Sequence, residues 1–591
     1  LSAFALSLSA VMMPAQAQVH DGDVVPNNVA ATAIGIGDAN TKALGENSTA
    51  IGNSANVTST GQNSKAIGNN ITVTKSHVTA TGNNVTVSGE NSSASGNNVT
   101  VLSANSSATG NNITLENHAY NNLLAMGNNI KVVHANSNAI GNNINVSHMN
   151  ASAIGNNISV SNLKSAAIGN DINVSNSTSL AIGNNVTVSQ EKTLAIGSDV
   201  NGRYANSVLI GDSTGNYGGT TGSRNILIGQ GAQVGDSTSV VRVNQSIAIG
   251  AGIRSDKTAK FGGNSITEGA WARGDQSIAI GGNVISYGNA SVAIGGDDTD
   301  LAAGAQTTYI DTNGKDKTGT VQNAFRDLTG ENLQNPRWVN TIAGEAAVSL
   351  GTKTRSGDLS LALGALAAAQ KTNAVAVGTG ANATLANSVA LGGGSATDRE
   401  GKALESYTFL GNTYSWAGGK KVIAGDVVSI GKEGYERQLI NLAPGNVSGT
   451  STDAINGSQL YSAFKAIEAV NLTTAGNTGT GAVNLATQSL NITGSNGLTT
   501  VATGNGIEVK IDDATRKKID AVSSAKEVSA SVSNGSTAVS VTPNGTTNAN
   551  GVEVTDYAVD LSQATKDDIQ KGVNANTTVT TKGLTFNGDS G

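Results

Sequence analysis

Apolar and polar positions alternate along the first third of the chain in a unit that repeats every fourteen residues. Residues 66–73 and 153–160 both read Ala-Ile-Gly-Asn-Asn-Ile, then a polar residue, then Val. The glycines of the unit stand at 68, 82, 96 and 110 and, after a three-residue insertion, at every fourteenth position from 127 to 211. A short fixed period predicts a solenoid, in which each repeat forms one coil stacked on the previous one.

The unit itself has the pattern of a strand. The residue two positions before the glycine is almost always Ala, and aliphatic residues stand three and five positions after it with a polar residue between them. This alternation is typical of β-strands rather than helices. The Gly-Asn-Asn triplet predicts a turn, because both residue types tolerate positive φ. The residues that define the unit are Ala66, Gly68, Asn69, Asn70, Ala153, Gly155, Asn156, Asn157 and Gly183.

Two further patterns describe the coil in more detail. Gly45 and Gly52 are seven residues apart, as are Gly61 and Gly68, which predicts two short strands and two turns per coil. In later repeats such as 247–250, aliphatic residues stand on both sides of a small residue. We therefore expect one face of the strand to fill the coil and the other to pack on a second surface, such as a neighbouring chain.

Composition narrows the class of protein. Gly accounts for 74 of 591 residues, aromatic residues for 3% and charged residues for 13%, and the net charge is −7. Few large side chains are available for a conventional core, and without a basic stripe we expect no nucleic-acid partner. The lack of cysteine excludes thiol catalysis and thiolate metal sites. Residues 1–17, an apolar stretch that ends in Ala-Gln-Ala, predict part of an export signal peptide.

Later segments carry the motifs of a known family. Residues 206–211 and 387–392 read Asn-Ser-Val-Leu-Ile-Gly and Asn-Ser-Val-Ala-Leu-Gly, residues 436–441 read Glu-Arg-Gln-Leu-Ile-Asn, and residues 452–460 read Thr-Asp-Ala-Ile-Asn-Gly-Ser-Gln-Leu. These motifs resemble the head repeat and the neck of YadA-like trimeric autotransporter adhesins. By this resemblance, the neck residues are Arg437, Gln438, Asn441, Asp453, Asn456, Gly457 and Leu460.

The resemblance implies a mainly all-β chain: a left-handed parallel β-roll head, three chains about one axis, a neck, a short coiled coil and small β-meander stalk domains. It also implies a homotrimer displayed on a Gram-negative cell surface, with an outer-membrane anchor C-terminal to residue 591. The implied partners are extracellular matrix, a host cell or another bacterium. Some relatives bind collagen through the head. Because Thr81, Ser95 and Thr109 replace the aliphatic residue before the glycine, we do not carry collagen binding over to this chain.

The expected domain order follows the changes of pattern along the chain. It comprises a partial signal peptide (1–17), a β-roll head (18–296), a head insert (297–344), a continuation of the head with a second insert (345–425), a neck (426–462), a short helical connector (463–470) and stalk β domains (471–591). In the stalk, the sequence of residues 509–515 recurs after fifty residues at 559–565, which predicts two related small domains, each closing with a helical turn.

The two inserts contain the candidate contact surface. The first carries Phe325 and Trp338, and the second, at about 397–425, carries Tyr414 and Trp416. Aromatic residues held away from a rigid scaffold are typical of contact sites, although local packing explains the second insert equally well. We interpret the acidic run at 297–300 as turn capping rather than a cation site, because it lacks the spacing of a calcium loop.

Three classes of function are compatible with a β-solenoid. A polysaccharide-acting enzyme needs clustered charged groups, but the acidic residues between 62 and 190 do not stack at the repeat spacing and the five histidines lack metal-ligand spacing. An ice-binding protein needs a long Thr ladder, and the ladder that starts at Thr72 fails at Lys131. Adhesion through a multivalent rod fits best. We expect no catalytic residue, metal or cofactor.

Overall fold

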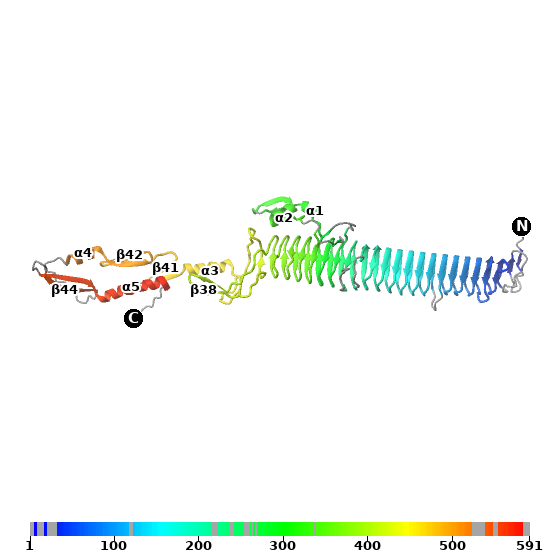
Figure 1. Ribbon diagram of the computed structural model, residues 1–591, viewed down its shortest axis with the longest axis horizontal. Helices are drawn as coiled ribbons and strands as arrows, with labels where there is room; N and C mark the ends of the chain where they lie inside the picture. Colours follow the sequence, from blue (N-terminus) through cyan, green and yellow to red (C-terminus); the bar gives the residue numbers. More distant parts are fainter. Residues whose placement is uncertain are drawn as a thin grey trace. The chain divides into compact units, whose positions relative to one another are not determined.

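A computed structural model describes residues 32–116, 122–215, 222–235, 242–252, 269–311, 313–335, 339–522, 538–547 and 553–582, and the backbone at 5–8, 17–20, 260–261 and 264–265. The chain divides into two compact units, residues 1–439 and 440–591 (Figure 1). The predicted signal peptide, 1–17, lies outside the described residues except for the backbone of β1 (Ala5–Leu8) and the first residue of β2 (Ala17–His20).

The first unit is a parallel β-solenoid of about 23 turns, as the fourteen-residue period predicts (Figure 1). Each strand pairs in register with the strand one coil later, so that Gly155 lies opposite Gly169 and Asn156 opposite Asn170. The long strands of this sheet are β7 (Lys65–Val73), β8 (Thr79–Val87), β9 (Ser93–Val101), β10 (Ser107–Leu115), β11 (Leu124–Val132), β12 (Asn138–Val146), β13 (Ser152–Val160), β14 (Ala166–Val174) and β15 (Leu180–Val188).

Shorter strands continue the same sheet on both sides of this region. They are β3 (Ile34–Gly37), β4 (Lys42–Ala43), β5 (Thr49–Gly52), β6 (Ala55–Val57), β16 (Leu194–Ser198), β17 (Asn201–Gly202), β18 (Val208–Asp212), β19 (Ile226–Ile228), β21 (Ile247–Ile249), β25 (Ile278–Ile280), β27 (Val292–Ile294), β31 (Val348–Leu350), β33 (Leu361–Leu363), β35 (Val375–Val377), β36 (Val389–Leu391) and β39 (Val428–Ser429).

A second parallel sheet covers the other half of the later coils. Its strands are β20 (Gln233–Val234), β24 (Trp271–Ala272), β26 (Val284–Ser286), β30 (Thr341–Ala343), β32 (Arg355–Ser356) and β34 (Ala368–Ala369). The later coils therefore hold two short strands each, as the seven-residue spacing of glycines predicts. From β7 to β15 the two halves instead form one nine-residue strand. A separate short hairpin pairs β22 (Lys260–Phe261) with β23 (Asn264–Ser265).

Each long coil bends at two corners that lie seven residues apart. Asn70, His77, Asn84 and Asn91 have φ of 53°, 58°, 51° and 53°, and the series continues at this spacing along the roll. Asn visits this left-handed region more readily than most residues because its short polar side chain bonds locally. The predicted turn at Gly-Asn-Asn is thus placed at the second Asn, where the nine-residue strand bends.

The glycine of the unit is required by stacking as well as by backbone angle. Gly155 has φ of 138°, and a Cβ placed on it would come within 1.8 Å of the carbonyl oxygen of Gly169 in the next coil. No side chain fits in that space, and L-residues rarely adopt such a φ. The invariance of this position along the repeats therefore follows from the distance between coils.

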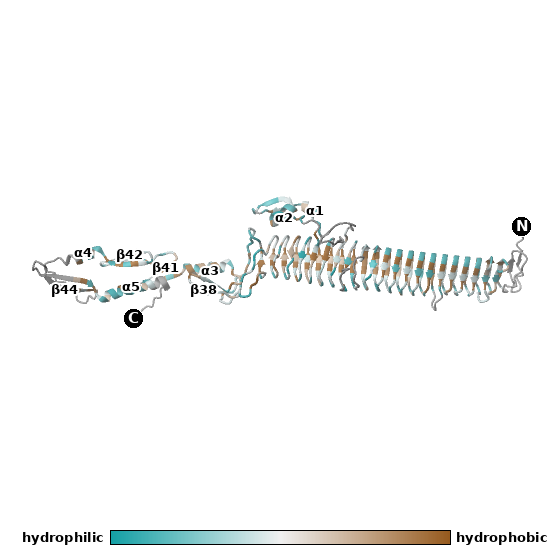
Figure 2. Ribbon diagram, in the orientation of Figure 1, coloured by the Kyte–Doolittle hydropathy of each residue, from teal (hydrophilic) through white to brown (hydrophobic). Residues whose placement is uncertain are grey.

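The interior of each coil is narrow and filled by small aliphatic side chains. Ala66, Ile71 and Val73 are fully buried, and their equivalents in the other long coils are buried in the same way. The residue before the glycine points outward, and Ile67 and Ile154 are 38% and 43% exposed. Hydrophobic residues recur coil after coil along the roll (Figure 2). The two faces of the strand thus have different surroundings, and the outward aliphatic stripe is uncovered in the single chain.

Two inserts leave the roll. The first contains α1 (Asp300–Gly304), β28 (Gln306–Ile310), β29 (Asp316–Thr320) and α2 (Val321–Thr329). It ends earlier than the predicted boundary of 344, because β30 pairs with β26 and β32 and is part of a coil. The second insert is a hairpin of β37 (Ser406–Phe409) and β38 (Asn412–Ser415).

The second unit consists of hairpins followed by helices. It contains α3 (Gly457–Glu468), β40 (Asn471–Ala475), β41 (Thr480–Asn484), β42 (Leu498–Thr503), β43 (Gly506–Ile511), α4 (Asp513–Val522), β44 (Val539–Thr547), β45 (Glu553–Leu561) and α5 (Gln563–Lys582). The fifty-residue repeat corresponds to a hairpin and a helix in each copy, β42–β43–α4 and β44–β45–α5. Both helices are longer than the predicted turn. None of the helices in the described part of the chain is long and apolar enough to cross a membrane.

The helix predicted at 463–470 begins six residues earlier, at Gly457. Asn456 explains this start, because its side chain accepts a hydrogen bond from the backbone N–H of Gln459 while the Gln459 side chain accepts one from the N–H of Asn456. This capping box satisfies N–H groups that a helix start would otherwise leave unpaired. The predicted boundary was misplaced because the cap residues Asn456 and Gln459 were assigned to the neck, which was expected to extend to residue 462.

Candidate functional site

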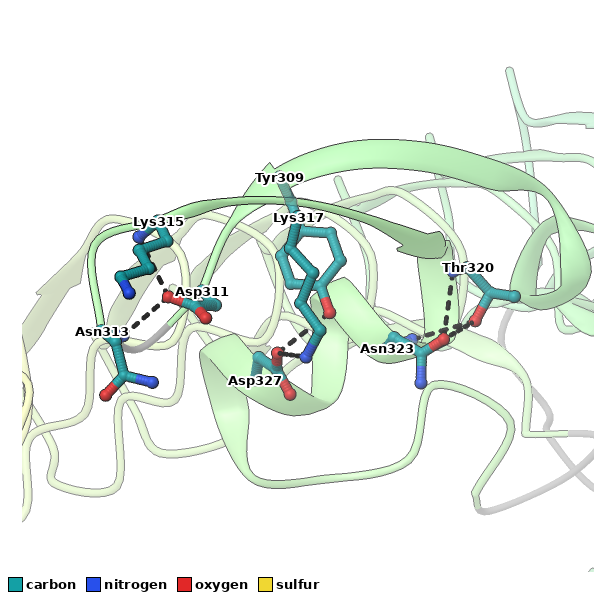
Figure 3. Close-up of polar contacts among 8 residues, drawn as sticks. All are labelled: Tyr309, Asp311, Asn313, Lys315, Lys317, Thr320, Asn323 and Asp327. Carbon is teal, nitrogen blue, oxygen red and sulfur yellow. Dashed lines mark hydrogen bonds and ion pairs between the residues drawn. The ribbon is translucent and has the colours of Figure 1, made fainter.

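The first insert forms a small subdomain in which a hairpin leads directly into helix α2 (Figure 3). Thr320 ends β29 and caps the helix, with its Oγ1 accepting a hydrogen bond from the backbone N–H of Asn323 at 3.2 Å. The side chain of Asn323 accepts in return from the N–H of Thr320 at 3.0 Å. At the hairpin turn, Asp311 accepts from the N–H groups of Asn313 and Lys315. The bond from Lys315 is the largest of the contacts that lower the pKa of Asp311.

Three polar side chains connect the hairpin to the helix (Figure 3). The Tyr309 hydroxyl donates to Oδ2 of Asp327 at 3.0 Å, and the Lys317 ammonium lies 3.4 Å from the same oxygen. Lys317 also lies 5.7 Å from the centre of the Tyr309 ring. Its contacts with Tyr309 and then with Asp327 raise the pKa of Lys317. This network fixes the hairpin against α2 and leaves the outer strand surface exposed.

Helix α2 turns its apolar side toward the later coils of the roll. Phe325 is only 3% exposed and packs with Ala303, Leu333 and Leu366. It is therefore a core residue of the insert, which corrects its assignment as a contact residue. Phe325 is buried because it lies on the apolar side of the short helix α2. The sequence alone did not show whether this side of the helix would be covered or exposed. Trp338, the other aromatic residue proposed for this insert, lies outside the described residues.

Glycines in the roll make room for the helix. A Cβ placed on Gly393 would come within 2.9 Å of Leu328, and one placed on Gly380 within 2.5 Å of Thr329. The close approach of helix and coils thus depends on residues without side chains. Lys432 then reaches the helix end, where its Nζ donates to the carbonyl oxygen of Thr329 at 2.7 Å.

The acidic run before α1 is used for local hydrogen bonds. Asp298 accepts from the backbone N–H of Asp300 at 2.7 Å, which is a turn-capping bond. Asp297 is nearly buried and accepts from Asn283 at 2.7 Å, and burial raises its pKa. Nearby, the buried ammonium of Lys353 donates to Thr299 Oγ1 at 3.0 Å. These bonds tie the start of the insert to the coils on either side.

The second insert presents aromatic residues to solvent. Tyr414 and Trp416 are 52% and 47% exposed, and the Tyr407 ring stacks on that of Trp416 with 6.1 Å between centroids. Phe409 and Leu410 at the hairpin tip are also exposed. Tyr414 and Trp416 therefore remain candidates for a contact surface.

The third exposed feature is the corner of each long coil, formed by the two consecutive Asn residues after the glycine. Both residues are exposed in every strand from β7 to β15, for example Asn69 and Asn70 in β7 and Asn156 and Asn157 in β13. Their side chains bond to the equivalent side chains one coil later, as from Asn156 to Asn170 at 2.9 Å. The corner is therefore a regular row of amides.

The predicted neck residues lie in both units. In the first unit, Arg437 donates from one nitrogen to Ser395 Oγ at 2.8 Å and to the Ile430 oxygen at 2.6 Å, and from the other to the Gly393 oxygen. It thereby satisfies carbonyl groups at the last coils. Gln438 is exposed.

The remaining neck residues, in the second unit, shape the approach to helix α3. Asn441 has φ of 60°, and Asp453 accepts from the N–H of Asn446 at 3.0 Å. Asn456 caps the helix, Gly457 is its first residue and Leu460 is 46% exposed.

Across the described ranges, no group of three or more His, Asp or Glu is arranged to hold a metal ion. His134 and His148 stack with 5.3 Å between ring centroids, in agreement with their spacing of one repeat.

The comparisons with known proteins agree with the repeats. The YadA head domain repeat matches residues 28–55, 43–70, 268–283, 272–297, 356–381 and 369–395. The trimeric autotransporter adhesin AtaA of Acinetobacter sp. strain Tol 5 is 34% identical over 264 residues, and the autotransporter adhesin BtaE of Brucella suis biovar 1 is 38% identical over 109 residues. The chain is homologous to YadA-like trimeric autotransporter adhesins.

The matches to these YadA-like adhesins are partial. The AtaA alignment covers 43% of this chain and 7% of AtaA, and the BtaE alignment covers 18% of this chain and 14% of BtaE. Among solved structures, the C-terminal YadA-like domain of a Burkholderia pseudomallei protein is 31% identical and covers 29% of this chain and 72% of that domain. Its TM-score is 0.16, too low to support an argument about the fold.

Sequence reasoning missed three features of the YadA-like head. The anchoring of the first insert by Lys353 and Lys432 could not be predicted, because a single Lys in a repeat is expected to be solvated. The packing role of Gly380 and Gly393 is visible only with α2 in place. The amide rows had a signal in the repeated Asn-Asn pair, which was interpreted as a turn alone.

Proposed function

We propose that the chain is the passenger segment of a cell-surface adhesin, a homotrimeric rod that attaches a Gram-negative bacterium to matrix, to host cells or to other bacteria. The observation that carries this proposal is homology to two adhesins together with exposed faces that repeat in identical form along the roll. Repetition supports multivalent contact, in which many weak sites add up to firm attachment. The proposed role is non-enzymatic, and the homology to autotransporter adhesins supports display at the outer membrane.

The homotrimer is supported by the outward aliphatic stripe. Residues before the glycine, such as Ile154, Ile168 and Met126, are more than 40% exposed in the single chain and lie in line on one face. Thr81, Ser95 and Thr109 interrupt the stripe in three coils, and from Met126 onward the position before the glycine is apolar in every following coil. An exposed apolar stripe of this length marks an interaction surface, which two further copies of the chain would cover.

The contact surface is assigned to the roll corners and the inserts. A non-adherent bacterium displaying the chain with its natural anchor tests the assignment, by counting cells bound to matrix proteins, host cells and glycans. We expect adherence to fall when residues 297–335 or the hairpin 404–418 are removed. Adherence equal to that of non-displaying cells on every surface would refute the adhesive function, and unchanged adherence of both deletions would refute the role of the inserts.

A further inference from the structure

Two adjacent rows of side-chain amides run along the same corner of the roll. The row at the second Asn connects six coils by five hydrogen bonds of 2.6–3.0 Å, through Asn70, Asn84, Asn98, Asn112, Asn129 and Asn143. The row at the first Asn connects five coils by four bonds of 2.8–2.9 Å, through Asn111, Asn128, Asn142, Asn156 and Asn170. We call these two rows the amide corner.

Every bond in the amide corner runs in one direction, from the Nδ2 of one coil to the Oδ1 of the next. An Asn amide has two N–H donors and two acceptor lone pairs. Each amide in the middle of a row therefore uses one donor and one acceptor within the row, and presents the other donor and acceptor to the outside. The corner offers a donor and an acceptor at every coil, about 4.8 Å apart.

The amide corner also carries almost no charge. Of the paired corner positions in β7–β15, all are Asn except Asp171, which accepts from Asn157. Charged side chains on exposed β-surfaces prevent association with other strands, and this corner lacks them over seven consecutive coils.

We propose that the amide corner docks against the same corner of a second copy of this chain, which joins rods side by side. The argument for this partner is the distance between successive coils, which two copies of the roll share. Only another roll with the same coil height offers donors and acceptors at the same spacing over many coils, whereas a polymer of different repeat loses register within a few. Stacked Asn ladders are known to add to the stability of cross-β assemblies. The proposal rests on the adhesive function above and names one of its partners.

The expected strength of one contact is low. From Asn70 in β7 to Asn170 in β14, seven steps of about 4.8 Å give a corner about 34 Å long. Two residues of about 3.3 Å give a width of about 7 Å, so that the corner covers roughly 240 Å² per partner. Stable protein interfaces bury about 800 Å² per partner. A single pair of rods is therefore expected to separate readily, and many pairs between two surfaces are expected to hold through avidity.

Beads coated with the 591-residue chain test the proposal, with clustering followed by light scattering. The test variant is Asn84→Asp, Asn112→Asp and Asn143→Asp. Asp is compatible with this corner, because Asp171 occupies it with φ of 51°. The matched control is Asn91→Asp, Asn105→Asp and Asn136→Asp, which places the same charges at exposed left-handed positions of the other corner.

We expect wild-type and control beads to cluster and the test variant to cluster about tenfold less or weaker still, because avidity amplifies a small loss per contact. A second variant, Asn84→Lys, Asn112→Lys and Asn143→Lys, is expected to stay dispersed when it is alone. It is expected to cluster when mixed with the Asp variant, because the charges on the two corners are then opposite. Lys is tolerated at a left-handed corner, as Lys164 and Lys192 show. Circular dichroism checks that each variant folds.

Four results would overturn the proposal. They are dispersed wild-type beads, equal clustering of wild type and test variant, no clustering of the mixed Asp and Lys beads, and an equal loss of clustering in the control, which would assign the effect to net charge. Attachment of the same beads to matrix proteins is measured in parallel. If the beads attach to matrix proteins but do not cluster with each other, the adhesive function stands and this proposal fails. If the beads cluster but attach to no other surface, adhesion is limited to copies of the chain.

Discussion

The ammonium of Lys432 donates to the main-chain oxygen of Thr329 at 2.7 Å, although 103 residues separate the two in sequence. Thr329 is the last residue of α2, so this bond pairs a cation with the carbonyl end of a helix, where it is favoured by the helix dipole. It also joins the end of the roll to an insert that leaves it several coils earlier.

Replacing Lys432 with Ala is expected to loosen the insert without unfolding the roll. Loss of one charge-assisted bond at a partly exposed site costs about 1 kcal/mol, which raises amide exchange in residues 321–330 about fivefold. Hydrogen exchange measures this directly. Lys420→Ala, on the exposed hairpin side, is the control and should change exchange nowhere in α2. Unchanged exchange in the Lys432 variant would mean that Phe325 and Leu328 suffice to hold the helix.

Gly155→Ala is expected to break the stack between two coils. The added Cβ would come within 1.8 Å of the Gly169 oxygen, and a φ of 138° is strained for Ala. We expect a loss of at least about 3 kcal/mol, measured as a lower melting temperature by circular dichroism. Gly304→Ala is the control, because nothing lies within 4 Å of the new methyl group and the position is helical. A Gly155 variant that melts like the control would show that coils can move apart at little cost.

Ionisation of the buried Tyr204 is expected to lower the free energy of unfolding at alkaline pH. Its side chain is fully buried, its hydroxyl donates to the Val234 oxygen at 2.7 Å, and burial raises its pKa to about 12. A raised pKa means that the fold favours the protonated form, so this stability is complete below pH 10 and is lost between about pH 10 and pH 12. The difference of about two pKa units corresponds to about 3 kcal/mol.

Urea unfolding at pH 8 and at pH 11.5 tests this link. We expect the stability difference between the two pH values to shrink in Tyr204→Phe, which cannot ionise. At pH 8 the Phe variant should itself lose about 1–3 kcal/mol, because the buried Val234 oxygen loses its donor. The same pH dependence in wild type and Phe variant would assign the alkaline loss to other groups.

Arg437→Gln is expected to fray the end of the roll. Gln cannot reproduce the hydrogen bonds that the guanidinium makes to the oxygens of Gly393 and Ile430 and to Ser395, and these are of the stronger charge-assisted kind. We expect faster hydrogen exchange in β36 and β39 and no change at β13. Arg399→Gln, at an exposed position nearby, is the matched control. Equal exchange in both variants would remove the capping role from Arg437.

The outward stripe predicts the oligomeric state. Placing Asp at Ile154 and Ile168 would bury two charges per chain in the proposed trimer interface, so we expect a large shift from trimer to monomer in sedimentation velocity. Asn173→Asp, at an exposed polar position of the coil that holds Ile168, should leave the trimer intact. A trimer that persists in the double variant would place the subunit contact on another face.

The sequence predicted the roll well because its determinants are local. The period sets the stack, the Ala at the position of Ala66 and the aliphatic residues at 71 and 73 set the interior, and the glycine sets the distance between coils. Seven-residue spacing also predicted two strands per coil, which is right for the later coils but not for β7 to β15, where the two halves form one nine-residue strand. By contrast, the burial of Phe325 depends in part on Leu366, which is distant in the sequence. The start of α3 was placed six residues too late because the residues that cap it, Asn456 and Gln459, were assigned to the neck.

The amide rows could be predicted from the sequence only in part. Asn69 and Asn70 were visible as a turn signal, but the bonds between coils become apparent only when the repeats are stacked in register. The bond from Asn111 to Asn128 spans seventeen residues instead of fourteen and still keeps the row. A pattern read only along the chain interprets the insertion as an interruption, whereas in the stack it leaves the corner continuous.

The in-register stacking of near-identical coils has a consequence for the evolution of the repeat number. Each coil touches only the one before and the one after, and both neighbours present the same surface. Recombination between near-identical repeats can therefore add or delete a whole coil without creating a new junction. The reach of the molecule from its cell would then be adjustable in steps of about 4.8 Å, with adhesive chemistry left untouched.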